Sequence, residues 1–189
     1  MYIGREADMP KLPIIFTTLL LLAAPAAAAP RPGFVAGPVF SDFGHIAPVE
    51  SDLAIPADSS FKVAFDVSAK ATPGEVNRTI DSAARFINMH VAAGVPAANI
   101  KVAIVVHGPA SGDLLKAAAY AARNSGSANG SAAPIAALAA HGVDIWLCGQ
   151  SAVASSIDKA DLIPGVKMAL SAMSAFALLQ QQGYTVNPF

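Results

Sequence analysis

The segment spanning residues 100–106 constrains the fold of this 189-residue chain more than any other. It is apolar at every position except Lys101, and five of its seven residues are β-branched. A strand that is apolar at both alternating sets of positions is covered on both faces, as in the parallel sheets of α/β proteins. Parallel neighbours need long crossovers, which are usually helices. This strand therefore predicts helices on both faces of a sheet.

Further strand and helix segments surround this run. Residues 61–67 (FKVAFDV) predict a first strand, and residues 72–93 predict the next helix because Thr72-Pro-Gly-Glu75 has the spacing of a capping box. Three more strands are expected, at residues 143–147, 166–170 and 184–186. This order predicts an α/β fold with a mostly parallel, open sheet of four or five strands and helices on both faces.

The single cysteine of the chain, Cys148, directly follows the predicted strand 143–147. Gly149 breaks the extended run, and residues 150–156 can begin a helix. A thiol beside the N–H groups at a helix start is stabilised as thiolate. An unpaired cysteine is also among the most buried residue types, so a purely structural role is the alternative.

Other polar groups are expected at the same edge of the sheet, because the carboxyl ends of parallel strands meet there. His107 follows the strand 100–106, and a cysteine beside a histidine permits a thiolate paired with an imidazolium, which supports nucleophilic attack. Cys148 and His107 are therefore the candidate catalytic residues. The weaker candidates for substrate contacts are Gly149, Gln150, Asp66 and Ser171.

The bulk composition argues against several other classes of function. The net charge is −1, the isoelectric point is about 6.4, and no run of basic residues is present, so we expect no nucleic-acid partner. The four histidines and the cysteine stand in separate segments, which predicts no metal site. We expect no bound cofactor, since no glycine loop has the spacing and context of a phosphate-binding motif.

The first 60 residues predict two segments outside the globular domain. Residues 1–29 resemble a signal peptide, with Lys11, an apolar stretch over 12–24 and small residues at 26–29. We therefore expect a periplasmic or secreted protein without a membrane span once this segment is removed. Residues 30–60, rich in proline, predict an extended arm that lies across the domain or a neighbouring subunit.

A second irregular segment, residues 123–131, is small and polar. Its composition predicts either a plain surface loop or a mobile lid.

Four segments carry a resemblance to a known family. They are FKVAFDV at 61–67, VAIVVHGP at 102–109, IWLCGQS at 145–151 and LIPGVKMAL at 162–170. From about residue 62 to residue 189 the chain resembles the DsrE/DsrF-like family, which includes bacterial sulfur-relay proteins and exported relatives. The resemblance implies a parallel α/β domain over residues 61–189 that assembles into trimers or hexamers. It also implies that a cysteine at the position of Cys148 accepts sulfur as a persulfide.

The resulting hypothesis is an exported oligomeric protein that binds or transfers sulfane sulfur through Cys148, with His107 tuning the thiolate. Gly149 and Gln150 would stabilise its charge, and another protein would act as sulfur donor or acceptor. Whether the protein is a sulfurtransferase or a carrier stays open. The alternative is a non-catalytic periplasmic binding or assembly module with a structurally buried cysteine.

Overall fold

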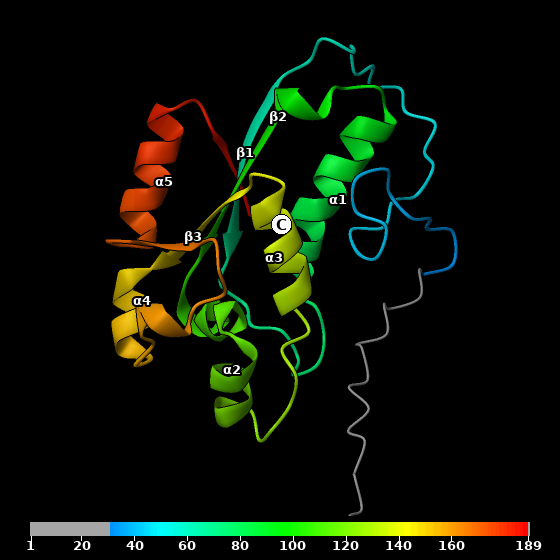
Figure 1. Ribbon diagram of the computed structural model, residues 1–189. Coiled ribbons are helices and arrows are strands. Elements are labelled where there is room, and N and C mark those ends of the chain that lie inside the picture. The colour runs from blue at the N-terminus through cyan, green and yellow to red at the C-terminus, as the bar shows by residue number, and fades with distance from the viewer. Residues whose placement is uncertain (1–30, 189) are drawn as a thin grey trace, which may run out of the picture.

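Five parallel strands form a single sheet in the order β4-β3-β2-β1-β5 in the computed structural model, which describes residues 31–188 (Figure 1). The strands are β1 (Phe61–Val67), β2 (Ile100–Val106), β3 (Asp144–Cys148), β4 (Val166–Ala169) and β5 (Thr185–Asn187). The α-helices are α1 (Arg78–Ala92), α2 (Ala117–Arg123), α3 (Ala132–Ala140), α4 (Gly149–Ala154) and α5 (Ala172–Gln181). Short 3₁₀ segments occupy Ala97–Asn99, Gly108–Leu114 and Lys159–Asp161. The predicted α/β fold with a parallel sheet is confirmed.

Helices cover the sheet on both faces, as the apolar pattern of β2 predicts. Phe65 and Ile104 belong to a large buried cluster that also contains side chains of α1 and α3. On the opposite face, Ala64, Ala103 and Val105 pack with α5. Figure 1 shows α5 on one side of the sheet and α1 and α3 on the other. The small side chains of Ala64 and Ala103 let α5 lie close to the strands.

The strand order places the start of α5 near the end of β3. Strands β1 to β4 follow one another across the sheet, and β5 then returns to the outer edge of β1. Helix α5 connects β4 to β5 and crosses the face of the sheet opposite α1 and α3. Its first turn therefore begins at the carboxyl edge of the sheet, where β3 and β4 end.

Helix α1 begins five residues later than the capping box predicts, because its N-cap is Asn77 and not Thr72. Thr72 and Glu75 form a turn instead, closed by a hydrogen bond from Glu75 N to Thr72 O. Asn77 caps the helix, because its Oδ1 accepts from the N–H of Thr79 at 3.0 Å. Its amide also donates to Asp113 Oδ2 at 2.7 Å, a partner that is distant in sequence. The predicted start at Thr72 was wrong because this tertiary contact selects a different cap.

The buried carboxylate of Asp113 joins three loops at the carboxyl edge. Besides Asn77, it accepts from the N–H of Ala71 at 2.8 Å, and only 2% of its surface is exposed. Asn129 donates to the carbonyl oxygen of Asp113, and Ser131 Oγ accepts from the N–H of Asn77. The second half of the 123–131 loop is therefore hydrogen-bonded to the body of the domain.

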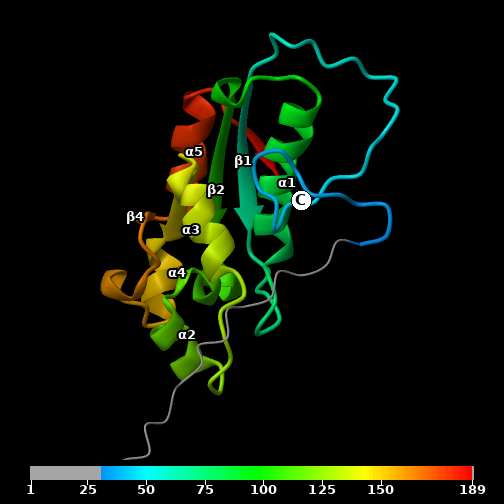
Figure 2. The ribbon, with the colours of Figure 1, turned by 45° about the vertical axis from the view of Figure 1, so that its right-hand side comes forward.

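The arm that precedes β1 lies across α1 (Figure 2). The Asn88 side chain is fully buried and bonds four backbone groups of the arm: it accepts from the N–H of Val39 and Phe40 and donates to the carbonyls of Phe40 and Gly44. A Cβ built at Gly37 would lie 2.1 Å from the Asn88 side chain, so the close approach requires glycine there. The predicted signal peptide, residues 1–29, lies outside the described residues.

No helix within residues 31–188 combines the length and the apolar character needed to cross a bilayer.

Replacing Asn88 with alanine should destabilise the protein by about 3 kcal/mol, because four backbone groups lose their partners and some stay buried. Urea unfolding measures this loss, and limited proteolysis should show faster cleavage within the arm. Asn99→Ala is the matched control: the Asn99 side chain makes one hydrogen bond within residues 31–188, a long one of 3.4 Å to the carbonyl of Ser59, so its loss should stay below about 1 kcal/mol. Equal losses in the two variants would contradict the role of Asn88 as the anchor of the arm.

The Asp113 carboxyl should make stability depend on pH. Burial raises the pKa of Asp113, and the hydrogen bonds from Asn77 and Ala71 only partly offset this rise. The folded protein therefore holds the proton to higher pH than the unfolded chain. The associated stabilisation is complete below the unfolded pKa, about 3.9, and disappears as pH rises through the raised folded pKa.

Asp113→Asn removes this titration and should flatten the decline in the free energy of unfolding above about pH 4. Urea unfolding over a series of pH values measures the slope. Asp158→Asn, at an exposed position, should retain the wild-type slope. If Asp113→Asn also retains it, Asp113 does not carry the effect.

Candidate functional site

Asp66, His107 and Cys148 come together at the carboxyl edge of the sheet. Val106 of β2 pairs with Leu147 of β3, so His107 and Cys148 occupy the next neighbouring positions. The backbone of His107 is still extended, and its N–H continues the ladder by donating to Val67 O. Because side chains alternate along strands, all three residues lie on the face that carries α5.

The His107 ring is held by Asp66. Its Nε2 lies 2.7 Å from Asp66 Oδ1, and about one third of each side chain is exposed. A carboxylate only accepts hydrogen bonds, so Nε2 carries the proton in this contact and Nδ1 is the nitrogen left for a second partner. A carboxylate that orients a histidine in this way recurs in sites where imidazole moves protons.

Cys148 is buried, with 6% of its surface exposed, but it belongs to neither cluster of buried hydrophobic side chains. It stands at the N-cap position of α4 without making a regular cap hydrogen bond. Burial raises the pKa of the Cys148 thiol, but the Ser151 hydroxyl and the N–H groups of Ser151, Ala172 and Gln150 outweigh this effect. The pKa of the Cys148 thiol therefore lies below its ordinary value, so the thiolate forms more readily than in a free cysteine.

The polar surroundings of the sulfur come from two helix starts. Gln150 and Ser151 lie in the first turn of α4, and Ala172 is the first residue of α5. His107 is not among the groups that lower the pKa of Cys148 in the described part of the chain. Cys148 and His107 thus lie at the ends of neighbouring strands. The groups that lower the pKa of Cys148 belong instead to α4 and α5.

Ser151 is a member of the site that the sequence prediction missed. Its Oγ accepts from the N–H of Gly108 at 2.9 Å, which leaves its hydroxyl proton available to the Cys148 sulfur. The residue therefore connects the end of β2 to the end of β3. The run Cys148-Gly-Gln-Ser151 is not a capping box, which has serine or threonine at the N-cap and glutamate or glutamine three residues later, so no such motif marked Ser151 in the sequence.

Three of the weaker candidates, Gly149, Gln150 and Ser171, hold together the segments around Cys148. A Cβ built on Gly149 would lie 2.7 Å from the carbonyl oxygen of Ala169, so glycine allows the ends of β3 and β4 to approach closely. The Gln150 amide donates to Leu170 O at 3.2 Å and ties α4 to the loop before α5. Ser171 caps α5 by accepting from Ser174 N at 3.0 Å, and so positions the N–H of Ala172.

Within residues 31–188, no group of three or more histidine, cysteine, aspartate or glutamate side chains has an arrangement suited to a metal ion. The chemistry that these residues can support is that of a thiolate beside a histidine–carboxylate pair.

The fold and the site define a parallel α/β protein that holds one thiol at the carboxyl edge of its sheet. The sequence model of the DsrE/DsrF-like family matches residues 62–188. The chain therefore belongs to the DsrE/DsrF-like family.

Two solved structures are similar to this chain at low sequence identity, and the YchN protein shares its fold. The YchN protein from E. coli is 15% identical with a TM-score of 0.51, and the match covers 68% of this chain and 99% of YchN. MTH1491 from Methanobacterium thermoautotrophicum, described as a protein of unknown function, is 16% identical with a TM-score of 0.48, over 69% of this chain and all of MTH1491. No curated protein matches the chain.

Ser151→Ala should raise the pKa of Cys148, because the thiolate loses a hydroxyl donor. The pH dependence of thiolate ultraviolet absorbance, taken as a difference from Cys148→Ser, should show its midpoint at higher pH. The N–H of Gly108 also loses its acceptor, which costs about 1 kcal/mol of stability. Ser155→Ala, at the exposed end of α4, serves as control. An unchanged midpoint in Ser151→Ala would show that the hydroxyl does not stabilise the thiolate.

Proposed function

We propose that this protein binds sulfane sulfur as a persulfide on Cys148 and passes it to another thiol. The observation that carries the proposal is the place of Cys148, which lies at the end of β3, next to the position of His107 and outside both apolar clusters. Neighbouring donors from α4 and α5 also lower the pKa of its thiol despite its burial. A structural cysteine packed among apolar side chains would have a raised pKa. Membership of the DsrE/DsrF-like family supports a sulfur-relay role.

The loading step needs no oxidant or reductant. The Cys148 sulfur attacks the sulfane sulfur of a persulfide or polysulfide, and a new S–S bond forms while the S–S bond of the donor breaks. The electron pair leaves with the donor thiolate. Attack by an acceptor thiolate on the outer sulfur of Cys148 reverses the step and restores the thiol. The same cysteine serves a carrier or a transferase, which differ only in how the partners are recognised.

His107 takes the thiol proton in this proposal. It lies at the neighbouring register position, and Asp66 binds its Nε2, which leaves Nδ1 to accept the proton from Cys148 or from an acceptor thiol. The Asp66 carboxylate then stabilises the imidazolium. The departing donor thiolate recovers the proton, so that charge is balanced over the step.

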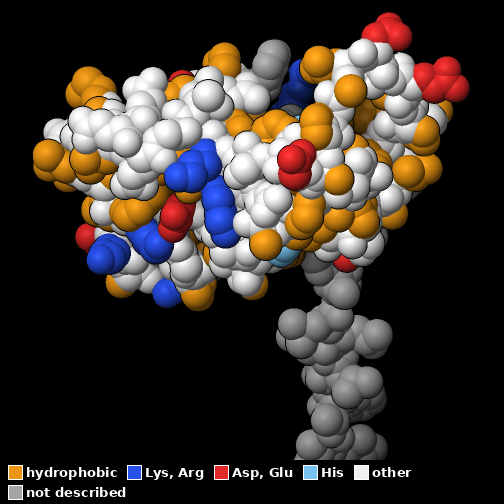
Figure 3. All heavy atoms as spheres, turned by 90° about the horizontal axis from the view of Figure 1, so that it is seen from above, with side chains coloured by type: hydrophobic (Ala, Val, Ile, Leu, Met, Phe, Trp, Pro, Cys, Tyr) orange, Lys and Arg blue, Asp and Glu red, His pale blue; other side chains and the backbone are white. Residues whose placement is uncertain are grey.

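The proposal includes export and assembly into a homo-oligomer such as a trimer or hexamer. The charged start, apolar stretch and small residues of positions 1–29 support export. Large apolar side chains near the start of α5 are exposed, namely Leu170 at 76% and Met173 at 77%. Figure 3, which views the molecule from above Figure 1, also shows hydrophobic side chains on the side of the molecule where α5 lies. Exposed apolar patches of this kind are typical of contact surfaces.

A second candidate is a non-catalytic binding or assembly module. The low exposure of Cys148 favours it, because a donor molecule must reach the sulfur. In this case the hydrogen bonds around the sulfur serve only to join β3, α4 and α5.

Incubation of the folded protein with polysulfide should add one sulfur atom, detected by intact-mass measurement and removed by a thiol reductant. Cys148→Ser should gain none. His107→Gln should load about tenfold more slowly, since general-base assistance is lost. Gln182→Ala, at an exposed position outside the site, should load at the wild-type rate.

No adduct on the folded wild-type protein, together with alkylation of Cys148 only in denaturant, would establish the second candidate instead. Equal loading rates for wild type and His107→Gln would remove His107 from the mechanism while leaving the role of Cys148 intact.

A further inference from the structure

A cavity of about 430 Å³ lies beside α1, on the opposite face of the sheet from Cys148. Its floor is Phe65 of β1 and its rim includes Asn187 of β5, which are register partners at the outer edge of the sheet. The cavity therefore has no part in the thiol site. Its size falls within the range of about 300–1,000 Å³ that small-molecule pockets occupy.

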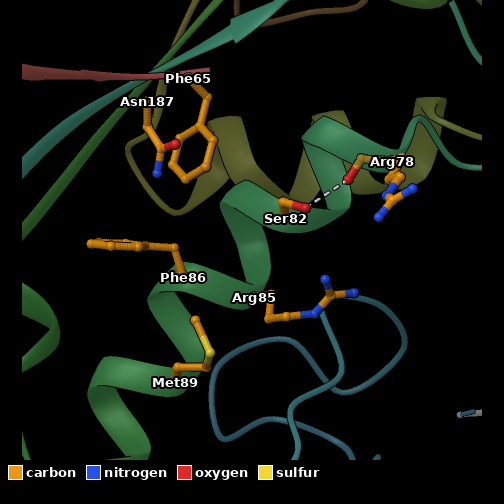
Figure 4. A pocket seen from close by; sticks show the side chains of 7 residues that line it. All are labelled: Phe65, Arg78, Ser82, Arg85, Phe86, Met89 and Asn187. Atoms are coloured by element: carbon orange, nitrogen blue, oxygen red, sulfur yellow. Dashed lines mark hydrogen bonds between the residues drawn. The ribbon is translucent and has the colours of Figure 1, made fainter. Parts of the chain in front are cut away.

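One stripe of α1 forms the rest of the lining, and this stripe changes character along its length. Arg78, Ser82, Arg85, Phe86 and Met89 recur at helical spacing. Figure 4 shows the guanidinium groups of Arg78 and Arg85 towards one end of the pocket and the side chains of Phe86 and Met89 towards the other. The pocket thus has a basic end and an apolar end.

The two arginines differ in their partners. Arg85 pairs with Asp81 and donates its Nε–H to His45 O, and it lies 5.6 Å from the ring centroid of Phe34. Its charge is therefore compensated, and the arm holds it in place. The guanidinium of Arg78 makes no hydrogen bond or ion pair with any residue in the range 31–188, and its side chain is exposed. One positive charge with five unused donors thus faces the pocket.

The apolar end is partly open to solvent. Met89 is 41% exposed although it stands next to the aromatic ring of Phe86, and Phe65 beneath it is buried. A ligand that covers Met89 and Phe86 would remove apolar surface from water, which is the main source of affinity in small pockets.

We propose that this pocket binds a small organic monocarboxylate with an aromatic or aliphatic body. The carboxylate bonds the Arg78 guanidinium in a forked arrangement, and the body lies over Phe86 and Met89. A single negative charge matches the single uncompensated arginine. Ser82, whose hydroxyl lies between the two ends and already donates to Arg78 O, has lone pairs left to accept from a polar group of the ligand.

The probe that tests this proposal is 3-phenylpropionate, titrated into the full-length folded protein by calorimetry and by saturation-transfer NMR. The expected dissociation constant is on the order of 1 mM or tighter for a molecule of this size. Two comparison compounds separate the two ends of the pocket. 3-Phenyl-1-propanol lacks the charge and propionate lacks the ring, and each should bind about tenfold more weakly than the probe.

Arg78→Ala should weaken binding of 3-phenylpropionate by about tenfold and leave the weak binding of the alcohol unchanged. Arg78→Lys should restore only part of the affinity, because lysine keeps the charge but not the fork. Lys159→Ala removes one positive charge from an exposed position outside the pocket and should bind like wild type. Circular dichroism confirms that the variants are folded.

Equal affinity in Arg78→Ala and wild type, equal affinity for the acid and the alcohol, or no binding at several millimolar would each overturn the proposal. Binding that is lost as the protein self-associates would show that this face is a contact between copies instead, and would also overturn it. Cys148→Ser should bind the probe like wild type, so this result is independent of the sulfur-binding proposal.

Discussion

The burial of β2 between β1 and β3 is the constraint on which the rest of the structure depends. A strand that is apolar on both faces is stable only inside a sheet with helices on each side, and parallel pairing then aligns its carboxyl end with those of its neighbours. That alignment brings Asp66, His107 and Cys148 to one edge and one face. The polar residues of the site are thus neighbours because the apolar residues of the strands must be covered.

The environment of Cys148 shows how the pKa of a buried thiol can still be lowered. Removal from water penalises the thiolate, and donors from α4 and α5 offset that penalty. The close approach of β4 to Gly149 brings the start of α5 within reach of the sulfur. Burial of the sulfur and stabilisation of its charge therefore have the same origin, the packing of two helix starts against the end of β3.

The two faces of the sheet carry different features. The face under α5 holds the thiol and the histidine–carboxylate pair, and exposed apolar residues lie close to it. The face under α1 is sealed by the arm, which is anchored through Asn88 and Arg85, and the cavity lined by Arg78 lies at its edge. The arm is thus part of the packed domain, because its backbone provides hydrogen-bond partners for polar side chains of α1 that would otherwise have none.

The sequence by itself determined the fold class, the strands and the placement of Cys148 and His107 at strand ends, because periodicity and turn residues act over short distances. It predicted a wrong start for α1, since the Asn77 cap depends on Asp113, a partner 36 positions away. Only the tertiary structure decided that the His107 ring binds Asp66 and that Ala172 stabilises the thiolate. Such contacts depend on the order of the strands and on the path of α5 across the sheet. Local sequence patterns determine neither the strand order nor this path.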